Sequence, residues 1–247
     1  MLKRCTLWIA ASLLLCSFII HAEKPLIIAG DHWPPFTSGN PTKGILFELS
    51  EAAFKTQGIP IKKIILPSQR TRLQLLAGNV DALNQHWYSD ERAEKMFYSK
   101  PYLFNIVHFF VGTDSSATFS KLEDLKGLKI ATIRGYFYGK VFAKAKDDFL
   151  LTTETGSIDE SFQMLKLKRV HVVIADRIAA RVAMKAFNIT GVKMLPKPLF
   201  TAGVHLVTDK KNPNGQQIVD TFNQGIEAIK ANGTYGKILE RYGVKLQ

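Results

Sequence analysis

Two successive runs of alternating strands and helices restrict the fold of this chain more than any other feature of its sequence. In the first run, short apolar and β-branched stretches predict strands at 26–29, 61–66 and 80–83. Helices are predicted between them, at about 45–58 and at 68–76, where Ser68 can serve as the helix cap. Strands that alternate with helices in this way indicate a parallel sheet covered by helices.

The pattern starts again in the second half of the chain. Strands are predicted at 128–133, 149–152 and 170–175, and helices at 141–146, 157–167 and 176–187. The stretch 72–83 also resembles 161–174, since each contains a capped helix, a turn and a buried strand. This repetition predicts two similar lobes rather than one large sheet.

The segments around Gly112 and Ala202 are the predicted crossings between these lobes. Further strands and helices are predicted at 106–111, 192–195, 204–208, 213–230 and 235–242. Lobe 1 is then discontinuous, with residues 23–111 and 203–247, and lobe 2 contains residues 112–202. We expect an α/β fold in which each lobe is a mostly parallel sheet flanked by helices, with two hinge crossings. Loops at the strand ends would face each other across a ligand-binding cleft.

Residues 1–22 have the order of a secretory signal peptide. Two basic residues precede an apolar run at 7–20, and cleavage is expected after Ala22. An uncleaved anchor is the alternative, but the apolar run is short for a membrane span. A lipid anchor at Cys16 is not expected, because Leu15 before it is not a small residue.

The cysteine count and the net charge limit the classes of function. Cys5 and Cys16 both lie in the predicted signal, so the rest of the chain has no disulfide and no thiolate nucleophile. The formal net charge is +12, and removal of Lys3 and Arg4 leaves +10. Such an excess can attract anions or nucleic acid. The basic residues are dispersed along the chain, so no nucleic-acid partner is expected.

Candidate ligand-binding side chains follow the first predicted strand. Asp31 and Trp33 lie in a loop that is stiffened by two prolines. An aromatic ring on such a loop can form a wall for a ligand or fill the core, and both remain open for Trp33. Phe36 is expected in the core.

A second group of candidates follows the strand predicted to end at residue 83. Gln85, Trp87 and Arg92 would point from the end of the sheet into the cleft. The guanidinium of Arg92 could hold a carboxylate or phosphate with two hydrogen bonds, or pair with an acidic neighbour on the surface. Either Arg70 or Arg72 could also reach the cleft, but we expect both on a solvated helix face.

In the second lobe, Tyr136, Phe137 and Tyr138 lie between Gly135 and Gly139, where a strand is followed by a helix. Free backbone N–H groups at such a position suit an anion, and the glycines allow the chain to approach a ligand closely.

Asp176 opens the helix that follows the strand at 170–175. An Asp at that position is an N-cap, and it can also hold an ammonium group if it faces the cleft. Both roles are compatible.

Signals of catalysis are poor. The chain has no Gly-x-Ser-x-Gly nucleophile elbow. Histidines at 32, 86, 108, 171 and 205 are scattered and have no metal-ligand spacing. We expect no catalytic residue, no metal and no cofactor.

Several short motifs, each weak alone, occur together in a specific order and spacing. They are Trp33-Pro-Pro-Phe36, Gly44 with Glu48-Leu49, Gly78 with Asp81-Ala82, Ser89-x-x-Arg92 with Tyr98-Ser99-x-Pro101-Tyr102, Leu122-x-x-Leu125-Lys126-Gly127, Ile174-Ala-Asp176 and Asn232-Gly-Thr-Tyr-Gly-Lys-Ile-Leu-Glu-Arg-Tyr-Gly243. With them, residues 24–243 resemble the bacterial extracellular solute-binding proteins of family 3, the polar amino-acid uptake type with the type II periplasmic binding fold.

The resemblance implies that two lobes close on one ligand. In the amino-acid binders of that family, the Arg at the position of Arg92 grips the ligand carboxylate. The Asp at Asp176 takes the ammonium group, and an aromatic residue at Trp33 packs on the ligand side chain. This chain departs from the pattern at 85–88 and 135–138, where aromatic residues replace small hydroxyl residues. The departure indicates a tighter cleft with more stacking, and it puts a standard α-amino acid in doubt.

From these residues and the resemblance, we expect a periplasmic protein that captures a small polar, carboxylated solute for an inner-membrane ABC permease. The solute would be an amino acid or a related compound, and the protein a monomer. One alternative is a periplasmic dehydratase-like enzyme that acts on a cyclic acid, with Glu154 or Glu160 as the nearest candidate acid. Another is a ligand-sensing envelope protein whose closed form is recognised by a partner.

Overall fold

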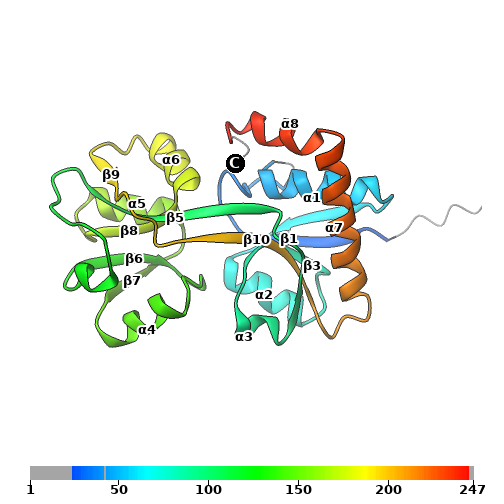
Figure 1. The fold of residues 1–247 in the computed structure, drawn as a ribbon, viewed down its shortest axis with the longest axis horizontal. Helices are drawn as coiled ribbons and strands as arrows, with labels where there is room; N and C mark the ends of the chain where they lie inside the picture. The colour runs from blue at the N-terminus through cyan, green and yellow to red at the C-terminus, as the bar shows by residue number, and fades with distance from the viewer. Residues whose placement is uncertain (1–23, 42, 245–247) are drawn as a thin grey trace, which may run out of the picture.

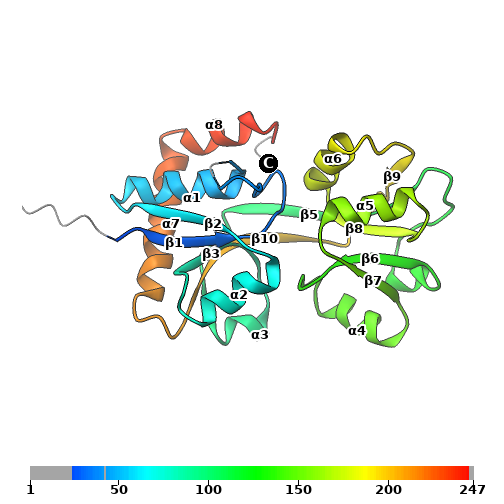
Figure 2. The same ribbon diagram turned by 180° about the vertical axis from the view of Figure 1, so that it is seen from behind.

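The computed structural model describes residues 24–41 and 43–244, so the predicted signal peptide lies outside the described residues. Within these residues two lobes share one ten-stranded sheet, and each lobe carries helices on both faces (Figure 1, Figure 2). The predicted two-lobed α/β fold is therefore confirmed. None of the helices in this part of the chain combines the length and the apolar character that crossing a bilayer requires.

Lobe 1 is built on three parallel strands. β1 (Leu26–Gly30) lies between β2 (Ile61–Ile65) and β3 (Ala82–Trp87) and is parallel to both. α1 (Ile45–Thr56) connects β1 to β2, and α2 (Ser68–Leu76) connects β2 to β3. Neighbouring parallel strands require helical crossovers of this kind, because a tight hairpin cannot join them.

Lobe 2 repeats the same arrangement. β6 (Lys129–Ile133) lies between β7 (Leu151–Thr155) and β8 (Val172–Asp176) and is parallel to both. α4 (Lys140–Asp148) and α5 (Ile158–Lys166) are the connecting helices. The repetition that the sequence predicted thus corresponds to α2–β3 in one lobe and α5–β8 in the other.

Two long strands, β5 (Leu103–Gly112) and β10 (Phe200–Asp209), run between the lobes (Figure 1). They pair with each other in antiparallel register over 103–107 and 200–204. Beyond this stretch β10 pairs with β3 in lobe 1, whereas β5 pairs with β8 in lobe 2. Each strand therefore belongs to both lobes.

The predicted lobe boundaries near Gly112 and Ala202 stay a prediction. Ala202 lies inside the stretch where β5 and β10 pair, whereas Gly112 is the last residue of β5. Residues 107–111 already pair with β8 of lobe 2. We therefore propose that the hinge consists of residues 103–107 and 200–204.

Two short strands pair with the two long strands of the sheet. β4 (Met96–Tyr98) pairs with β10, and β9 (Val192–Met194) pairs with β5, both in antiparallel register. The short helix α3 (Asp90–Ala93) precedes β4 and follows β3.

Helices cover the sheet in layers (Figure 1, Figure 2). On one face of lobe 1, α1 packs against α7 (Gly215–Ala231) and α8 (Thr234–Arg241), while α2 and α3 lie on the other face. In lobe 2, α5 packs against α6 (Arg177–Ala186) on one face. The side chains of α4 and of the 3-10 helix η1 (Leu122–Leu125) share a core on the opposite face.

The main difference from the predicted elements is the length of β3. It extends to Trp87, beyond the predicted end at Leu83, because its last residues pair with Val204 and His205 of β10. Gln85 and Trp87 therefore lie on a strand that enters the cleft, and the predicted strand end at Leu83 is wrong.

The helix caps follow the predictions at two of three positions. The Ser157 hydroxyl accepts a hydrogen bond from the backbone N–H of Glu160 at 3.2 Å, and Asp176 caps α6. The predicted cap at Ser68 is wrong. Ser68 is the first helical residue of α2, Pro67 precedes it, and no side chain caps this helix.

The α1–α7 contact gives a test of the packing. Gly225 of α7 faces the backbone of Ala53, and a Cβ atom at Gly225 would lie 2.3 Å from the Ala53 carbonyl oxygen. Alanine is a better helix former than glycine by about 1 kcal/mol, but overpacking against an immobile backbone costs about 1–3 kcal/mol or more. We expect Gly225→Ala to lower the free energy of unfolding by about 1–3 kcal/mol in urea titrations.

The neighbouring exposed residue of α7 supplies the control. Gln224→Ala also introduces an alanine into α7, but at an exposed position and in place of a good helix former, so we expect it to leave stability within about 0.5 kcal/mol of the wild type. Equal stability of the two variants would show that α1 and α7 can move apart without a loss of folding free energy.

Candidate functional site

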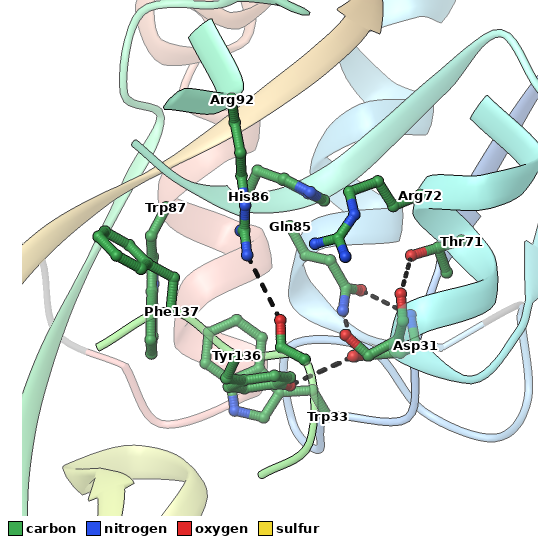
Figure 3. A pocket seen from close by; sticks show the side chains of 12 residues that line it. Asp31, Trp33, Thr71, Arg72, Gln85, His86, Trp87, Arg92, Tyr136 and Phe137 are labelled. Atoms are coloured by element: carbon green, nitrogen blue, oxygen red, sulfur yellow. Dashed lines mark hydrogen bonds between the residues drawn. The ribbon is translucent and has the colours of Figure 1, made fainter. Parts of the chain in front are cut away.

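A cavity lies between the lobes, where the parallel strands end (Figure 3). Its lobe 1 wall comes from the loop after β1 and from α2, β3 and α3, and its lobe 2 wall from the loop after β6. The free volume is about 40 Å³, enough for water but not for an amino acid. We call this cavity the inner chamber. It is lined by Asp31, Trp33, Ser68, Thr71, Arg72, Gln85, His86, Trp87, Arg92, Gly135, Tyr136 and Phe137.

A larger cavity, which we call the outer chamber, adjoins the inner one and has a free volume of about 420 Å³. Asp31, Trp33, Ser68 and Tyr136 line both chambers and therefore stand between them. The outer chamber continues between the start of α2 in lobe 1 and the start of α5 in lobe 2.

Asp31 is the acidic group of the site. Its backbone N–H donates to Gln85 Oε1 at 2.9 Å, and the Gln85 side-chain amide donates back to its carboxylate. From lobe 2, the Tyr136 hydroxyl donates to Asp31 Oδ2 at 3.3 Å. Burial raises the pKa of Asp31 above its ordinary value of 3.8, and hydrogen bonds from Gln85, Ser68 and Tyr136 partly oppose that rise.

Three aromatic rings meet beside Asp31. Trp33 and Trp87 of lobe 1 lie edge to face with ring centroids 5.7 Å apart. Tyr136 of lobe 2 packs against both rings edge to face, 6.1 Å from Trp33 and 5.9 Å from Trp87. Such pairs add to the apolar burial that holds the lobes together. Phe36 is fully buried behind Trp33, as predicted, so Trp33 is both a wall of the chambers and part of the core.

Arg72 of α2 and Arg92 of α3 are the basic groups of the site, and both side chains enter the inner chamber from lobe 1 (Figure 3). Arg92 Nη2 donates a long hydrogen bond of 3.4 Å to the carbonyl of Gly135, and the guanidinium lies 5.8 Å from the centre of the Phe137 ring. Burial and then the nearby charge of Arg72 lower the pKa of Arg92. Within residues 24–41 and 43–244, neither arginine forms an ion pair with a carboxylate.

His86 of β3 lies beside the two arginines. Burial, followed by the charges of Arg92 and Arg72, lowers the pKa of His86 to about 3. The imidazole is therefore neutral at ordinary pH. Its Nδ1 is buried and has no hydrogen-bond partner in the described part of the chain.

Ionic contacts at the rim also cross the cleft. Lys140 Nζ of lobe 2 lies 2.5 Å from Asp90 Oδ2 of lobe 1, between exposed side chains. His32 Nε2 of lobe 1 lies 3.6 Å from Asp159 Oδ2 of lobe 2. The hydrogen bond with Asp159 raises the pKa of His32, so this contact strengthens as the pH falls.

The structure brings most of the predicted site residues around the inner chamber. They are Asp31, Trp33, Gln85, Trp87, Arg92, Tyr136 and Phe137. Their roles toward a ligand stay predictions.

Tyr138 lies apart from this group. It is buried against Phe142 of α4, with ring centroids 5.6 Å apart, and its hydroxyl accepts the backbone N–H of Ile133 at 3.0 Å. This position stabilises the loop after β6 from the lobe 2 core. The sequence could not distinguish it from Tyr136, because a loop has no fixed side-chain periodicity.

Asp176 also lies outside both chambers. Oδ1 accepts the backbone N–H groups of Ile178 and Ala179 at 2.8 and 3.1 Å. Oδ2 accepts the backbone N–H of Ile106 at 3.1 Å and the side-chain amide of Asn105 at 3.3 Å. Both carboxylate oxygens are thus engaged by the start of α6 and by β5, and the side chain lines a separate cavity beside α6 and α8.

Sequence reasoning missed part of the lining. Arg70 is exposed, as expected, but Arg72 reaches the inner chamber instead of a solvated face. Helical spacing could have indicated this, since Ser68, Arg72 and Leu75 share one face of α2 and Leu75 is buried. His86 was noted only as a scattered histidine, and its position became defined when β3 extended into the cleft.

The two candidate acids for catalysis are engaged elsewhere. Glu154 forms ion pairs with Arg134 and Lys146 at 3.3 and 3.4 Å. Glu160 accepts the backbone N–H of Gly156 at 2.6 Å at the start of α5. Neither acid lines the inner or the outer chamber. In the described residues, His, Cys, Asp and Glu side chains form no group of three or more that could hold a metal ion.

Comparison with known sequences identifies a protein family. The profile of the bacterial extracellular solute-binding proteins, family 3, matches residues 26–245. The ABC transporter arginine-binding protein 1 of Escherichia coli (strain K12) is 26% identical over 155 residues. That match covers 62% of this chain and 61% of the relative, less than two thirds of its length.

Comparison with solved structures agrees with the fold. A histidine kinase sensor domain with similarity to periplasmic binding proteins has a TM-score of 0.81 and 17% identity, covering 90% of this chain and 96% of that domain. An ancestral arginine-binding protein bound to arginine has a TM-score of 0.78 and 25% identity, covering 90% of this chain and 99% of that protein.

The raised pKa of Asp31 makes stability depend on pH. The folded state keeps a proton that the unfolded chain releases near 3.8, so stability falls as the pH rises from 3.8 through the raised pKa. We expect Asp31→Asn to remove this fall, since the amide still accepts from Gln85 and is never charged. Urea unfolding of both proteins between pH 4 and 8 measures the difference.

The matched control is Asp147→Asn, which changes an exposed carboxylate of α4. We expect its stability to follow the wild-type pH profile. If the Asp31→Asn profile also runs parallel to the wild type, Asp31 is not the group that couples folding to protons.

Proposed function

Because the chain belongs to the bacterial extracellular solute-binding proteins of family 3, we propose that it binds one small polar, carboxylated solute between its lobes. The observation that carries the proposal is Arg92. Its guanidinium enters a closed chamber, has no carboxylate partner in residues 24–41 and 43–244, and already contacts the opposite lobe through Gly135. A partly buried cation without a counter-ion loses hydration, and a bound carboxylate offsets that loss with two charge-assisted hydrogen bonds.

An ammonium or another donor of the same solute would bind Asp31. This carboxylate borders both chambers and is held by Gln85 and Tyr136. A cation beside it would restore its ionised form despite burial. We propose Asp31 for this role in place of Asp176, whose oxygens are engaged by backbone and amide donors.

Ligand entry requires the cleft to open. The inner chamber holds only about 40 Å³, and Tyr136 of lobe 2 packs against both Trp33 and Trp87 of lobe 1. Bending at the hinge, residues 103–107 and 200–204, would withdraw Tyr136 and join the two chambers. The solute then binds lobe 1 and stabilises closure by bridging both lobes, as in other hinge-bending proteins.

The same family supports a proposal for the wider setting of the protein. The solute is an amino acid or a related acid, and the protein delivers it as a monomer to an inner-membrane ABC permease. The arginine-binding relatives support the amino-acid class. The signal-like order of residues 1–22 supports export to the periplasm.

The first experiment is a thermal-shift screen of the protein against amino acids, dicarboxylic acids, cyclic acids, sugars and small peptides. A ligand at 100 times its Kd adds about 2.7 kcal/mol to stability, which raises the Tm measurably. A carboxylated hit supports the proposal. Turnover of a cyclic acid would support the dehydratase, and silence of the whole panel would favour the partner-binding role.

Arg92→Gln tests the carboxylate contact. Loss of a charged hydrogen-bond pair costs about 1.5–3 kcal/mol, so we expect the Kd of the best hit to rise about tenfold to hundredfold in calorimetric titrations. Arg169→Gln, which removes an exposed arginine of lobe 2, should leave the Kd unchanged. Equal affinities of the two variants would mean that the carboxylate binds elsewhere.

A further inference from the structure

The inner chamber contains more positive charge than one carboxylate can balance. We infer that the bound solute is dianionic, a short dicarboxylate whose two acidic groups are held by Arg72 and Arg92 together. The inference rests on the proposed function and narrows its class of substrate.

The geometry supports a shared anion site. Arg72 enters the inner chamber from α2 and Arg92 enters it from α3, so two separate elements aim guanidinium groups into one space (Figure 3). His86 of β3 lines the same chamber, and its buried Nδ1 has no hydrogen-bond partner in the described residues. Each of the three side chains presents unused hydrogen-bonding capacity to the chamber.

The acidic residues nearby do not neutralise the two arginines. Asp90 pairs with Lys140 at the rim, and Asp31 is engaged by Gln85 and Tyr136. Glu91 attracts Arg92 only at a distance and forms no ion pair with it. In the described part of the chain, neither guanidinium group is therefore ion-paired with a carboxylate.

The charge count favours a dianion. The neutral imidazole of His86 adds a hydrogen-bonding group but no charge. The positive charge of the inner chamber therefore comes from the two arginines. A monocarboxylate would leave one confined guanidinium unpaired when the cleft closes, whereas two carboxylates give each arginine a planar partner.

The shape of the cavities limits the size of the ligand. The arginines share a small chamber, so the two acidic groups must be joined by a short chain. The remainder of the molecule can extend past Asp31 into the outer chamber of about 420 Å³. A dicarboxylic amino acid, with its ammonium group at Asp31, satisfies all three charges. An arginine ligand would instead bring a further cation to the site.

Calorimetric titration with matched ligands tests the inference. We expect glutamate and glutarate to bind at least about tenfold more tightly than glutamine and pentanoate, which have the same carbon skeletons with one acidic group fewer. Inorganic phosphate and arginine complete the set. Tighter binding of phosphate than of any dicarboxylate would overturn the dicarboxylate assignment, and tighter binding of arginine than of glutamate would overturn the dianion itself.

Variants of α2 assign the second charge to a residue. Arg72→Gln should remove the preference for glutamate over glutamine while binding of glutamine changes little. Arg72→Lys should keep part of that preference. Arg70→Gln removes the same charge from the exposed face of the same helix and should change neither affinity.

The outcomes separate this inference from the proposed function. If Arg72→Gln weakens glutamate and glutamine equally, Arg72 only positions its neighbours and the inference is wrong, while the solute-binding function stands. If Arg72→Gln and Arg70→Gln behave alike, the inference is also wrong. If no carboxylated ligand binds the wild type, the proposed function and the inference fail together.

Discussion

The antiparallel pairing of β5 with β10 is the constraint on which the rest of the structure depends. Residues 103–107 and 200–204 are hydrogen bonded to each other, and each strand then continues into the sheet of a different lobe. The lobes therefore cannot separate without breaking sheet hydrogen bonds, but they can change their angle by bending one short two-stranded segment. This connection also places the ends of β1 and β3 opposite the end of β6, so that the cleft forms there.

Closure of this cleft has an electrostatic consequence. It surrounds Arg92, Arg72 and Asp31 with protein, where charged groups need partners. The opposite lobe supplies only weak partners for these charges. Arg92 donates a long hydrogen bond to the Gly135 carbonyl, and Asp31 accepts one from the Tyr136 hydroxyl. Aromatic contacts of Trp33 and Trp87 with Tyr136 supply apolar stabilisation instead. A ligand that offers better partners for the same charges can therefore favour closure more strongly than these internal contacts do.

Local geometry decides which residues of the site could be predicted from the sequence. Strand and helix patterns placed the loops of both lobes at one cleft, and seven of the proposed side chains line its inner chamber. For Arg72 a solvated face was favoured over the cleft, whereas the helical spacing sets Arg72 on the inward face with Leu75. Tyr138 was proposed with its loop neighbours, and Asp176 as a helix cap that could face the cleft. The Tyr138 side chain instead turns into the lobe 2 core, and the Asp176 carboxylate binds the start of α6 and β5.

Periodicity, caps and turn residues act over a few residues, so the sequence by itself determined the elements, their order and the division into two similar lobes. Its motifs also determined the family, which the profile match shows. Only the tertiary structure decided which side chains meet, since that depends on pairing between distant segments. The pairing of β3 with β10 extended β3 into the cleft and gave His86 its place beside two arginines. The donors of β5 and α6 engaged Asp176 and left Asp31 as the carboxylate that faces the chambers, because a buried acceptor binds the donors that the fold brings nearest.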